Sequence, residues 1–271
     1  MPVLVHDGHP VYESKDQIAY ICSDKFRGPD LLPPEKQQPS TAAGGAILQD
    51  LYALTKIIPG DCDRATMGNC VPGLTLPIFI AMVQDIPITE IMWGLKNHPN
   101  KERPMAFLLM RVMGAGTLSL PFFCHWTRMS RLTMRWHLKI LEDRIFSDGR
   151  KFLLGDKFCL SDVGLMPVFE RMRVCQWSHL WEDLPLVSAY WERLRKRPSY
   201  KKAIKDEELP CIGKGQYRLK QWKQQKEWFK ATLDSDEDIL YCALRRYQPL
   251  WLYVGFGILV WLVILRWFGW V

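Results

Sequence analysis

The chain has 271 residues, 48% of them hydrophobic, and a formal net charge of +7 at neutral pH. This length suffices for one or two domains, each with its own hydrophobic core. The basic residues are interleaved with acidic ones along most of the chain, which is typical of a solvated surface and does not favour a nucleic-acid partner. The eight cysteines include no C-x-x-C pair, so they indicate reduced thiols rather than a disulfide framework or a zinc site. The first residues do not show the basic region followed by a long apolar stretch that is typical of a secretory signal. We therefore expect the N-terminal bulk of the chain to face the cytosol.

A β-hairpin is predicted at the start of the sequence. Asp7 and Gly8 both tolerate positive φ, and they lie between two short apolar, β-rich stretches. His6 and His9 flank this turn without further ligands at zinc spacing, so no metal site is predicted. Residues 15–22 have helical spacing and are followed by a proline-rich connector, which indicates a small αβ fragment.

Several helices are predicted in the middle of the chain. Residues 41–57 carry one apolar stripe and end at a Pro-Gly-Asp sequence. Helices are also expected over residues 162–173 and 184–197, the second of them stopped by Pro198. The stretch 60–125 is rich in methionine and proline and has no clear period, so we interpret it as an insert.

A long helix is predicted over residues 129–146. Apolar residues recur there at helical spacing, and the helix should end at the Asp148-Gly149 turn. The predicted core stripe consists of Leu132, Trp136, Ile140 and Leu141.

Residues 217–233 are basic and aromatic. Leu219, Trp222, Phe229 and Leu233 fall near one helical face, while lysine and arginine occupy much of the remainder. Such a composition suits either a nucleic acid or a membrane surface. The apolar segment that follows favours the membrane surface.

The last segment is predicted to span a membrane. Residues 250–265 read LWLYVGFGILVWLVIL, without a charge or a proline. A spanning helix needs ~20 residues, so Arg266 would have to reach the far interface. Leu250 and Trp251 mark the near end of the anchor, and Leu265 and Arg266 mark the far end.

Two motifs resemble the glutathione S-transferase family. Pro2, Val3 and Leu4 precede the hairpin, and Glu13-Ser14 starts the next helix, as in the second half of the family's thioredoxin-like domain. The sequence FLLGDKFCLSDVGLMPVFERM resembles the signature of its second, all-helical domain, in which Asp162 forms a capping box with the residue three before it. Here that residue is Cys159, where serine or threonine is usual.

The resemblance defines the expected architecture. The fold should be mainly α: a partial thioredoxin-like αβ fragment, an all-helical C-terminal-like domain of the transferase type, and one C-terminal transmembrane helix. The expected divisions are residues 1–28 for the αβ fragment, 29–40 for a linker, 41–205 for the helical domain with its insert at about 60–125, 206–246 for a juxtamembrane segment and 247–271 for the tail anchor.

Three further stretches resemble the ganglioside-induced differentiation-associated protein 1 group: LTKIIPGDCDRATMGNCVPGLT, NHPNKERPM and LPLVSAYWERLRKRPSYKKAI. The group implies a homodimer, glutathione as a ligand rather than a cofactor, and a tail-anchored location on the mitochondrial outer membrane with a role in organelle shape. Endoplasmic reticulum and peroxisome are alternative locations.

The resemblance assigns glutathione binding to Pro2, Glu13 and Ser14. The alternative is that Ser14 only caps a helix. The family's β1-α1-β2 part, which supplies the thiol-activating residue, does not precede Pro2, so no catalytic residue is assigned and weak or absent glutathione binding is expected. Two functions stay open: a scaffold with little or no catalysis, and a genuine glutathione transferase whose first segment is missing from the gene model.

Overall fold

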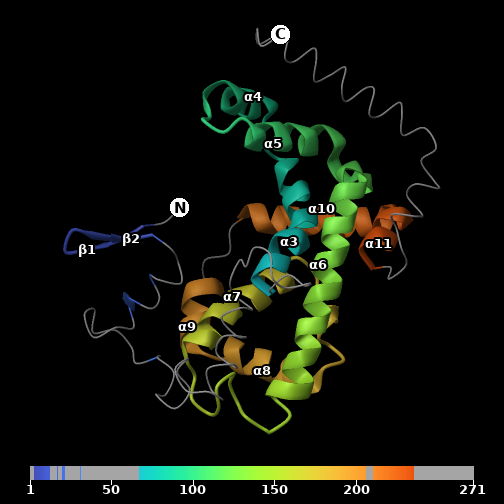
Figure 1. Cartoon of the computed structure of the whole chain (residues 1–271). Helices are drawn as coiled ribbons and strands as arrows, with labels where there is room; N and C mark the ends of the chain where they lie inside the picture. Colours follow the sequence, from blue (N-terminus) through green and yellow to red (C-terminus); the bar gives the residue numbers. More distant parts are fainter. Residues whose placement is uncertain are drawn as a thin grey trace.

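The computed structural model describes residues 3–12, 17, 20–21, 31, 67–205 and 210–234; the helix predicted over residues 41–57 and the tail, residues 247–271, lie outside them. The described part is mostly helical and has one two-stranded sheet, as predicted (Figure 1). The elements are β1 (Leu4–His6), β2 (His9–Val11), α3 (Met67–Val83), α4 (Ile88–Asn97), α5 (Glu102–Met113), η2 (Gly114–Ser119), α6 (Pro121–Ile140), η3 (Leu141–Ile145), α7 (Leu160–Val174), η4 (Ser178–Leu180), α8 (Pro185–Arg195), α9 (Pro198–Tyr200), η5 (Lys201–Lys205), α10 (Pro210–Gln225) and α11 (Glu227–Asp234).

The predicted hairpin is confirmed. β1 and β2 pair antiparallel, and the two residues between them, Asp7 and Gly8, have φ values of 50° and 77°. Two successive positive φ angles give a turn whose twist matches that of the strands. The His6 ring nitrogen Nδ1 is hydrogen-bonded to the Tyr20 hydroxyl at 2.8 Å, so the helical residues after the hairpin pack back on it.

Helix α3 is the centre of the bundle and lies among α6, α7 and α10 (Figure 1). Its buried side chains occur around the whole circumference, so its sequence lacks the one-sided apolar pattern of a surface helix. Two prolines, Pro72 and Pro77, lie inside it. A Cβ added to Gly73 would lie 2.1 Å from the Ser130 Oγ atom of α6, so glycine permits the close approach of the two helices.

The stretch predicted as an insert, residues 60–125, therefore contains the central core helix. Beyond α3, the chain turns into α4 and α5, which contact one another and extend from one end of the bundle (Figure 1). The Gln84 amide donates hydrogen bonds to the carbonyl oxygens of Ile80 and Met110, at 3.2 and 2.7 Å. These bonds join α5 to the last turn of α3.

Helix α6 begins at Pro121 rather than at residue 129, with proline at its first position, where no N–H is needed. The stripe predicted for it is confirmed only in part: Leu141 is buried and Leu132 and Ile140 are half-buried, but Trp136 is 40% exposed. The buried face instead combines apolar and polar side chains, and it is formed by Cys124, Thr127, Ser130, Arg131, Thr133, Met134, His137 and Leu138. Small polar side chains suit this face because α3 approaches it so closely.

Helices α7 and α8 coincide with two predicted helices to within a few residues. The Phe169 ring of α7 stacks on Trp191 of α8 at a centroid distance of 5.4 Å and meets Trp181 edge-on at 5.3 Å. Pro198 follows the end of α8, as predicted, and also starts the short helix α9. The aromatic contacts join these helices into one core.

Helices α10 and α11 form from the basic, aromatic segment. Leu219, Phe229 and Leu233 are buried, and α10 packs on α3. The apolar face predicted for a membrane surface is thus covered by the protein itself. Any contact of this segment with a membrane would use its basic side.

No single helix in the described ranges combines the length and apolar composition needed to span a bilayer. Two pairs of helices do so together, but each is sharply bent: Met67–Val83 with Ile88–Asn97 by 115°, and Glu102–Ser119 with Pro121–Ile145 by 64°.

Candidate functional site

The sequence assigns functional roles to three groups of residues. Two of these groups lie outside the described residues: those predicted to bind glutathione, Pro2, Glu13 and Ser14, and those predicted to mark the ends of the anchor, Leu250, Trp251, Leu265 and Arg266. The third group, Cys159 and Asp162, is described. A further polar site lies between α10 and the end of α3.

Both contacts of the capping box at the start of α7 are present. The Cys159 N–H donates a hydrogen bond to Oδ2 of Asp162 at 2.9 Å, and the Asp162 N–H points to the Cys159 sulfur. The Asp162 N–H also donates a hydrogen bond to the Cys159 carbonyl oxygen at 3.0 Å, and the Asp162 carboxylate satisfies the Cys159 N–H at the helix start. The resemblance to the signature of the transferase helical domain predicted this pairing.

Asp162 also joins the start of α7 to two other parts of the domain. Its Oδ1 atom accepts hydrogen bonds from the Leu153 N–H at 3.1 Å and from the Tyr190 hydroxyl of α8 at 2.9 Å. Asp162 and Tyr190 are both fully buried. Burial and the adjacent carboxylate raise the pKa of Tyr190 well above its ordinary value, so its proton stays in this bond. The cluster is structural, because its hydrogen bonds are made within the protein.

Glu170 forms a second polar cluster, which the sequence analysis missed. Its carboxylate accepts hydrogen bonds from the Tyr200 hydroxyl at 2.6 Å and from the Arg173 guanidinium at 2.7 and 2.9 Å. The hydrogen bond from Arg173 could have been predicted from the sequence, because Glu170 and Arg173 are three residues apart on one predicted helix. The contact with Tyr200 had none, because it depends on how α9 folds back on α7.

The described cysteines are mostly poor nucleophiles. Burial raises the pKa of Cys70 and Cys175 to about 12 and that of Cys159 to about 11, and it also raises the pKa of Cys124. These thiols stay protonated near neutral pH, whereas the thiolate is the reactive form. Cys211, in the first turn of α10, is exposed.

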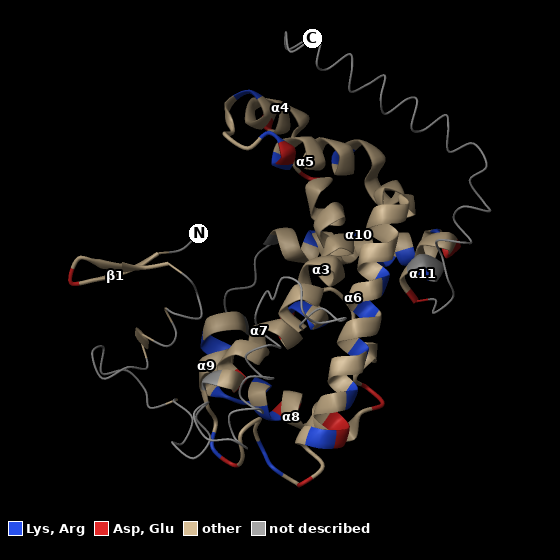
Figure 2. Cartoon of the chain, viewed as in Figure 1, with Lys and Arg blue, Asp and Glu red and all other residues tan. Residues whose placement is uncertain are grey.

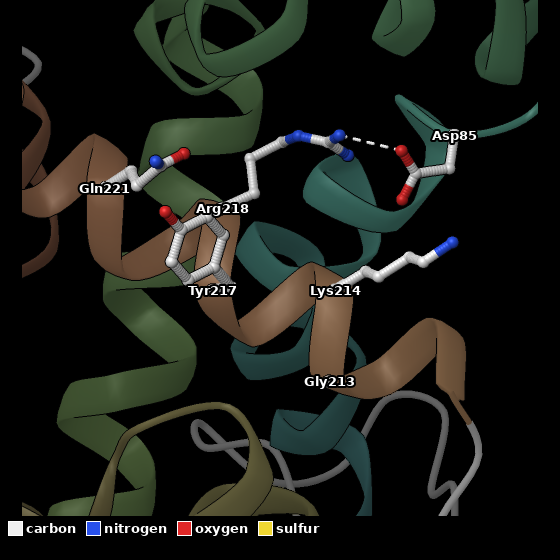
Figure 3. A pocket seen from close by; sticks show the side chains of 6 residues that line it. All are labelled: Asp85, Gly213, Lys214, Tyr217, Arg218 and Gln221. Carbon is white, nitrogen blue, oxygen red and sulfur yellow. Dashed lines mark hydrogen bonds and ion pairs between the residues drawn. The ribbon is translucent and has the colours of Figure 1, made fainter.

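An open notch of about 330 Å³ lies between α10 and the loop after α3 (Figure 3). The Arg218 guanidinium donates hydrogen bonds to Asp85 Oδ1 at 2.7 Å and to the Ala81 carbonyl oxygen at 2.6 Å. The hydrogen bond from Arg218 is the main cause that lowers the pKa of Asp85. The residues that line the notch are Asp85, Gly213, Lys214, Tyr217, Arg218 and Gln221.

The notch presents polar and charged side chains to the solvent. Within the described residues, Lys214, Tyr217 and Gln221 make no hydrogen bond through their side chains, so their donors are available to a ligand. Asp85 is neutralised by Arg218, which leaves Lys214 as the excess charge and favours an anion. The described lining of the notch contains no nucleophile with an adjacent base.

Comparison with known proteins shows which class of protein part of the helical domain is similar to. Residues 127–207, which include the capping box, match the family model described as glutathione S-transferase, C-terminal domain. The chain is glutathione S-transferase-like in this region, as the signature around Asp162 predicted. A particular relative is glutathione S-transferase TCHQD of Arabidopsis thaliana, which is 34% identical over 71 residues.

The extent of that similarity is limited. The aligned residues cover 25% of this chain and 27% of the relative, so the chain spans about a quarter of the relative's length. No solved structure matches the chain significantly. The matches do not reach the narrower ganglioside-induced differentiation-associated protein 1 group.

Proposed function

We propose that this chain is a tail-anchored, glutathione S-transferase-like protein on the cytosolic face of an organelle membrane, the mitochondrial outer membrane in particular. The observation that carries the proposal is a transferase-like helical domain followed by an uncharged, proline-free apolar run over residues 250–265. A helix of this composition is stable in a bilayer. The resemblance to the ganglioside-induced differentiation-associated protein 1 group supports the choice of organelle. It also implies that the chain forms a homodimer.

The proposed role is organelle shaping or redox-linked recruitment with little or no catalysis. The buried carboxylates of Asp162 and Glu170 are engaged in structural hydrogen bonds. The buried thiols are held protonated, and the notch on α10 offers donors without a nucleophile. These features support a domain that binds partners or small ligands and does not transform them.

Membrane attachment is tested by deleting residues 247–271 and separating soluble from carbonate-resistant membrane fractions. The intact chain should stay in the membrane fraction, and the shortened chain should become soluble. Carbonate-resistant association of the shortened chain would contradict the proposal. A fluorescent protein fused to residues 247–271 alone would report the organelle.

A second candidate function is a genuine glutathione transferase, because the relative from Arabidopsis thaliana is named as one. Calorimetric titration with glutathione and conjugation of 1-chloro-2,4-dinitrobenzene distinguish the two candidates. For the 271-residue chain we expect a dissociation constant in the millimolar range or weaker, and no conjugation above background. Micromolar affinity that is lost in Ser14→Ala would favour the enzyme.

A further inference from the structure

The face of α10 that lines the notch is turned away from the bundle. Lys214, Tyr217, Arg218 and Gln221 follow one another at intervals of three, one and three residues, so they lie on one side of the helix. Leu219 lies on the other side and is fully buried, whereas Tyr217 is 66% exposed. The notch is therefore open to solvent, and its side chains are accessible to a dissolved molecule.

Three cations surround one carboxylate at the notch. Lys214 and Arg218 extend from α10 toward Asp85 (Figure 3). The Nε atom of Arg111, on α5, donates a hydrogen bond at 3.1 Å to the carbonyl oxygen of Ile86, the residue after Asp85. The hydrogen bond from Arg218, together with the charges of all three cations, lowers the pKa of Asp85, so its carboxylate is ionised at neutral pH. Three positive charges against one negative charge leave a net charge of +2.

Part of this charge is not compensated within the described part of the chain. Arg218 is bonded to Asp85 and to the Ala81 carbonyl oxygen. The Lys214 ammonium, in contrast, makes no hydrogen bond or ion pair with a described residue, and Lys214 is exposed. Asp85 is also the only acidic residue in the described lining. A negatively charged ligand can therefore reach Lys214 without displacing an acidic side chain of the protein.

We propose that the notch binds a small phosphate monoester. The inference rests on the ligand-binding role proposed above and adds the chemical class of the ligand. A phosphate monoester carries nearly two negative charges on one compact group at neutral pH, so it balances the net charge of +2. Lys214 pairs with the phosphate oxygens, while the Tyr217 hydroxyl and the Gln221 amide donate hydrogen bonds to the rest of the molecule. The volume of the notch, about 330 Å³, suits a ligand of this size.

Other ligands fit the notch less well. A metal ion would bring further positive charge to a site with an excess of cations, and the one carboxylate of the described lining is bonded to Arg218. Glutathione carries an ammonium group and two separate carboxylates, so its charge is spread out and amounts to one negative charge in total. A monocarboxylate would leave one positive charge of the notch unbalanced. Of these ligands, a compact dianion matches the charge of the site.

The test is calorimetric titration of the full chain in non-ionic detergent with glycerol 3-phosphate and, separately, with acetate. Lys214→Gln removes the unpaired cation. Gly213→Glu places a carboxylate in the lining, and a Cβ at this position meets nothing within 4 Å, so the helix is preserved. The matched control, Lys139→Gln, removes an exposed lysine from the last turn of α6, at the other end of the bundle from α4 and α5 (Figure 2). Circular dichroism confirms that each variant is folded.

We expect glycerol 3-phosphate to bind with a dissociation constant of about 1 mM and acetate to bind about tenfold more weakly. Lys214→Gln and Gly213→Glu should each weaken the binding of glycerol 3-phosphate about tenfold, and Lys139→Gln should weaken it by less than about twofold. An unchanged affinity in both notch variants would overturn the site, and equal affinities for acetate and glycerol 3-phosphate would overturn the ligand class. If the wild type binds neither, this site is overturned, while membrane attachment, which carbonate extraction measures separately, is unaffected.

The source of the phosphate group is resolved with the full chain in nanodiscs. Phosphatidic acid is a lipid whose headgroup is the same phosphate monoester. If the notch holds such a headgroup, nanodiscs of phosphatidylcholine with phosphatidic acid should lower the apparent affinity for glycerol 3-phosphate relative to phosphatidylcholine alone. If the natural ligand is a soluble phosphate ester, the two affinities should be equal. Either result supports the site, provided that Lys214→Gln weakens the binding in both nanodiscs.

Discussion

Asp162 accepts three hydrogen bonds in the buried part of the helical domain, from the Leu153 N–H, the Cys159 N–H and the Tyr190 hydroxyl. Its replacement by alanine would leave two backbone N–H groups and the Tyr190 hydroxyl buried without their acceptor. We expect Asp162→Ala to lower the free energy of unfolding by about 3–5 kcal/mol, since each buried, unpaired donor costs about 1–3 kcal/mol. Urea denaturation in detergent solution, followed by tryptophan fluorescence, measures this.

Tyr190→Phe is the matched control for that variant. It removes one hydroxyl and leaves Asp162 with both N–H donors, so its expected cost is only about 1 kcal/mol. Cys159→Ser should raise stability by up to about 1 kcal/mol, because a hydroxyl is a better cap acceptor than a thiol. Equal losses for Asp162→Ala and Tyr190→Phe would show that the backbone contacts of Asp162 contribute nothing.

The ion pair between Asp85 and Arg218 makes the stability of the domain depend on pH in the acid range. Because Arg218 lowers the pKa of Asp85 in the folded chain, the pair stabilises the fold fully above the ordinary carboxyl pKa of about 4. That contribution to stability is lost as the pH falls through the lowered pKa of Asp85 in the folded chain. The urea midpoint of the wild type should fall between pH 5 and pH 3, and Asp85→Asn should show a smaller fall.

Asp143→Asn is the control for this pH profile. Asp143 is an exposed carboxylate in η3 with no hydrogen bond or ion pair among the described residues. Its replacement should leave the acid profile of the wild type unchanged. If Asp85→Asn and Asp143→Asn gave the same profile, the ion pair would have no measurable effect on stability.

At the scale of residues, local contacts were predictable and distant ones were not. The pairing of Cys159 with Asp162 follows from their spacing across the start of a helix. The contact of Asp162 with Tyr190 spans 28 residues, and it depends on α8 packing across α7. The notch on α10 was not predicted either, because Asp85 and Arg218 are 133 residues apart in the sequence.

Two glycines on α10 provide a test of how closely this helix packs on α3. A Cβ added to Gly215 would lie 2.6 Å from Cγ of Met82 and 3.3 Å from Cγ1 of Ile78, while one added to Gly213 would meet nothing within 4 Å. We expect Gly215→Ala to destabilise the chain by about 1–3 kcal/mol through overpacking. Gly213→Ala should stabilise it by about 0.5–1 kcal/mol, because alanine favours the helix. Opposite signs in thermal denaturation would confirm the packing, and a gain in both variants would contradict it.

At the scale of elements, helices with one apolar face were predicted better than helices without one. α7 and α8 were found within a few residues of their predicted ends. α3 was missed because it is buried on all sides and contains two prolines, so neither its period nor its composition indicates a helix. On α6 the periodicity identified the buried face only in part, since Trp136 is exposed and the threonines and Arg131 are buried.

The proposed membrane attachment depends on residues 247–271. Arginine at the centre of a spanning helix opposes insertion by about 2.5–3.5 kcal/mol, and much less near the interface. Ile258→Arg should therefore shift the chain toward the soluble fraction, whereas Trp251→Arg should stay largely with the membrane. Carbonate extraction of cells that express each variant measures the distribution. Equal extraction of the two variants would argue against a spanning tail centred near residue 258.

The prolines inside α3 have a consequence for the order in which the domain forms. Each proline in a helix interior costs about 3 kcal/mol, so an isolated segment with both Pro72 and Pro77 is a poor helix. α3 acquires its helical form only together with the neighbours that bury it, and those neighbours have no common centre without it. Partial unfolding around α3 is thus costly, and its amide protons should exchange with solvent only when the entire bundle opens. A polypeptide emerging from the ribosome would then hold this segment unstructured until α10 has been synthesised.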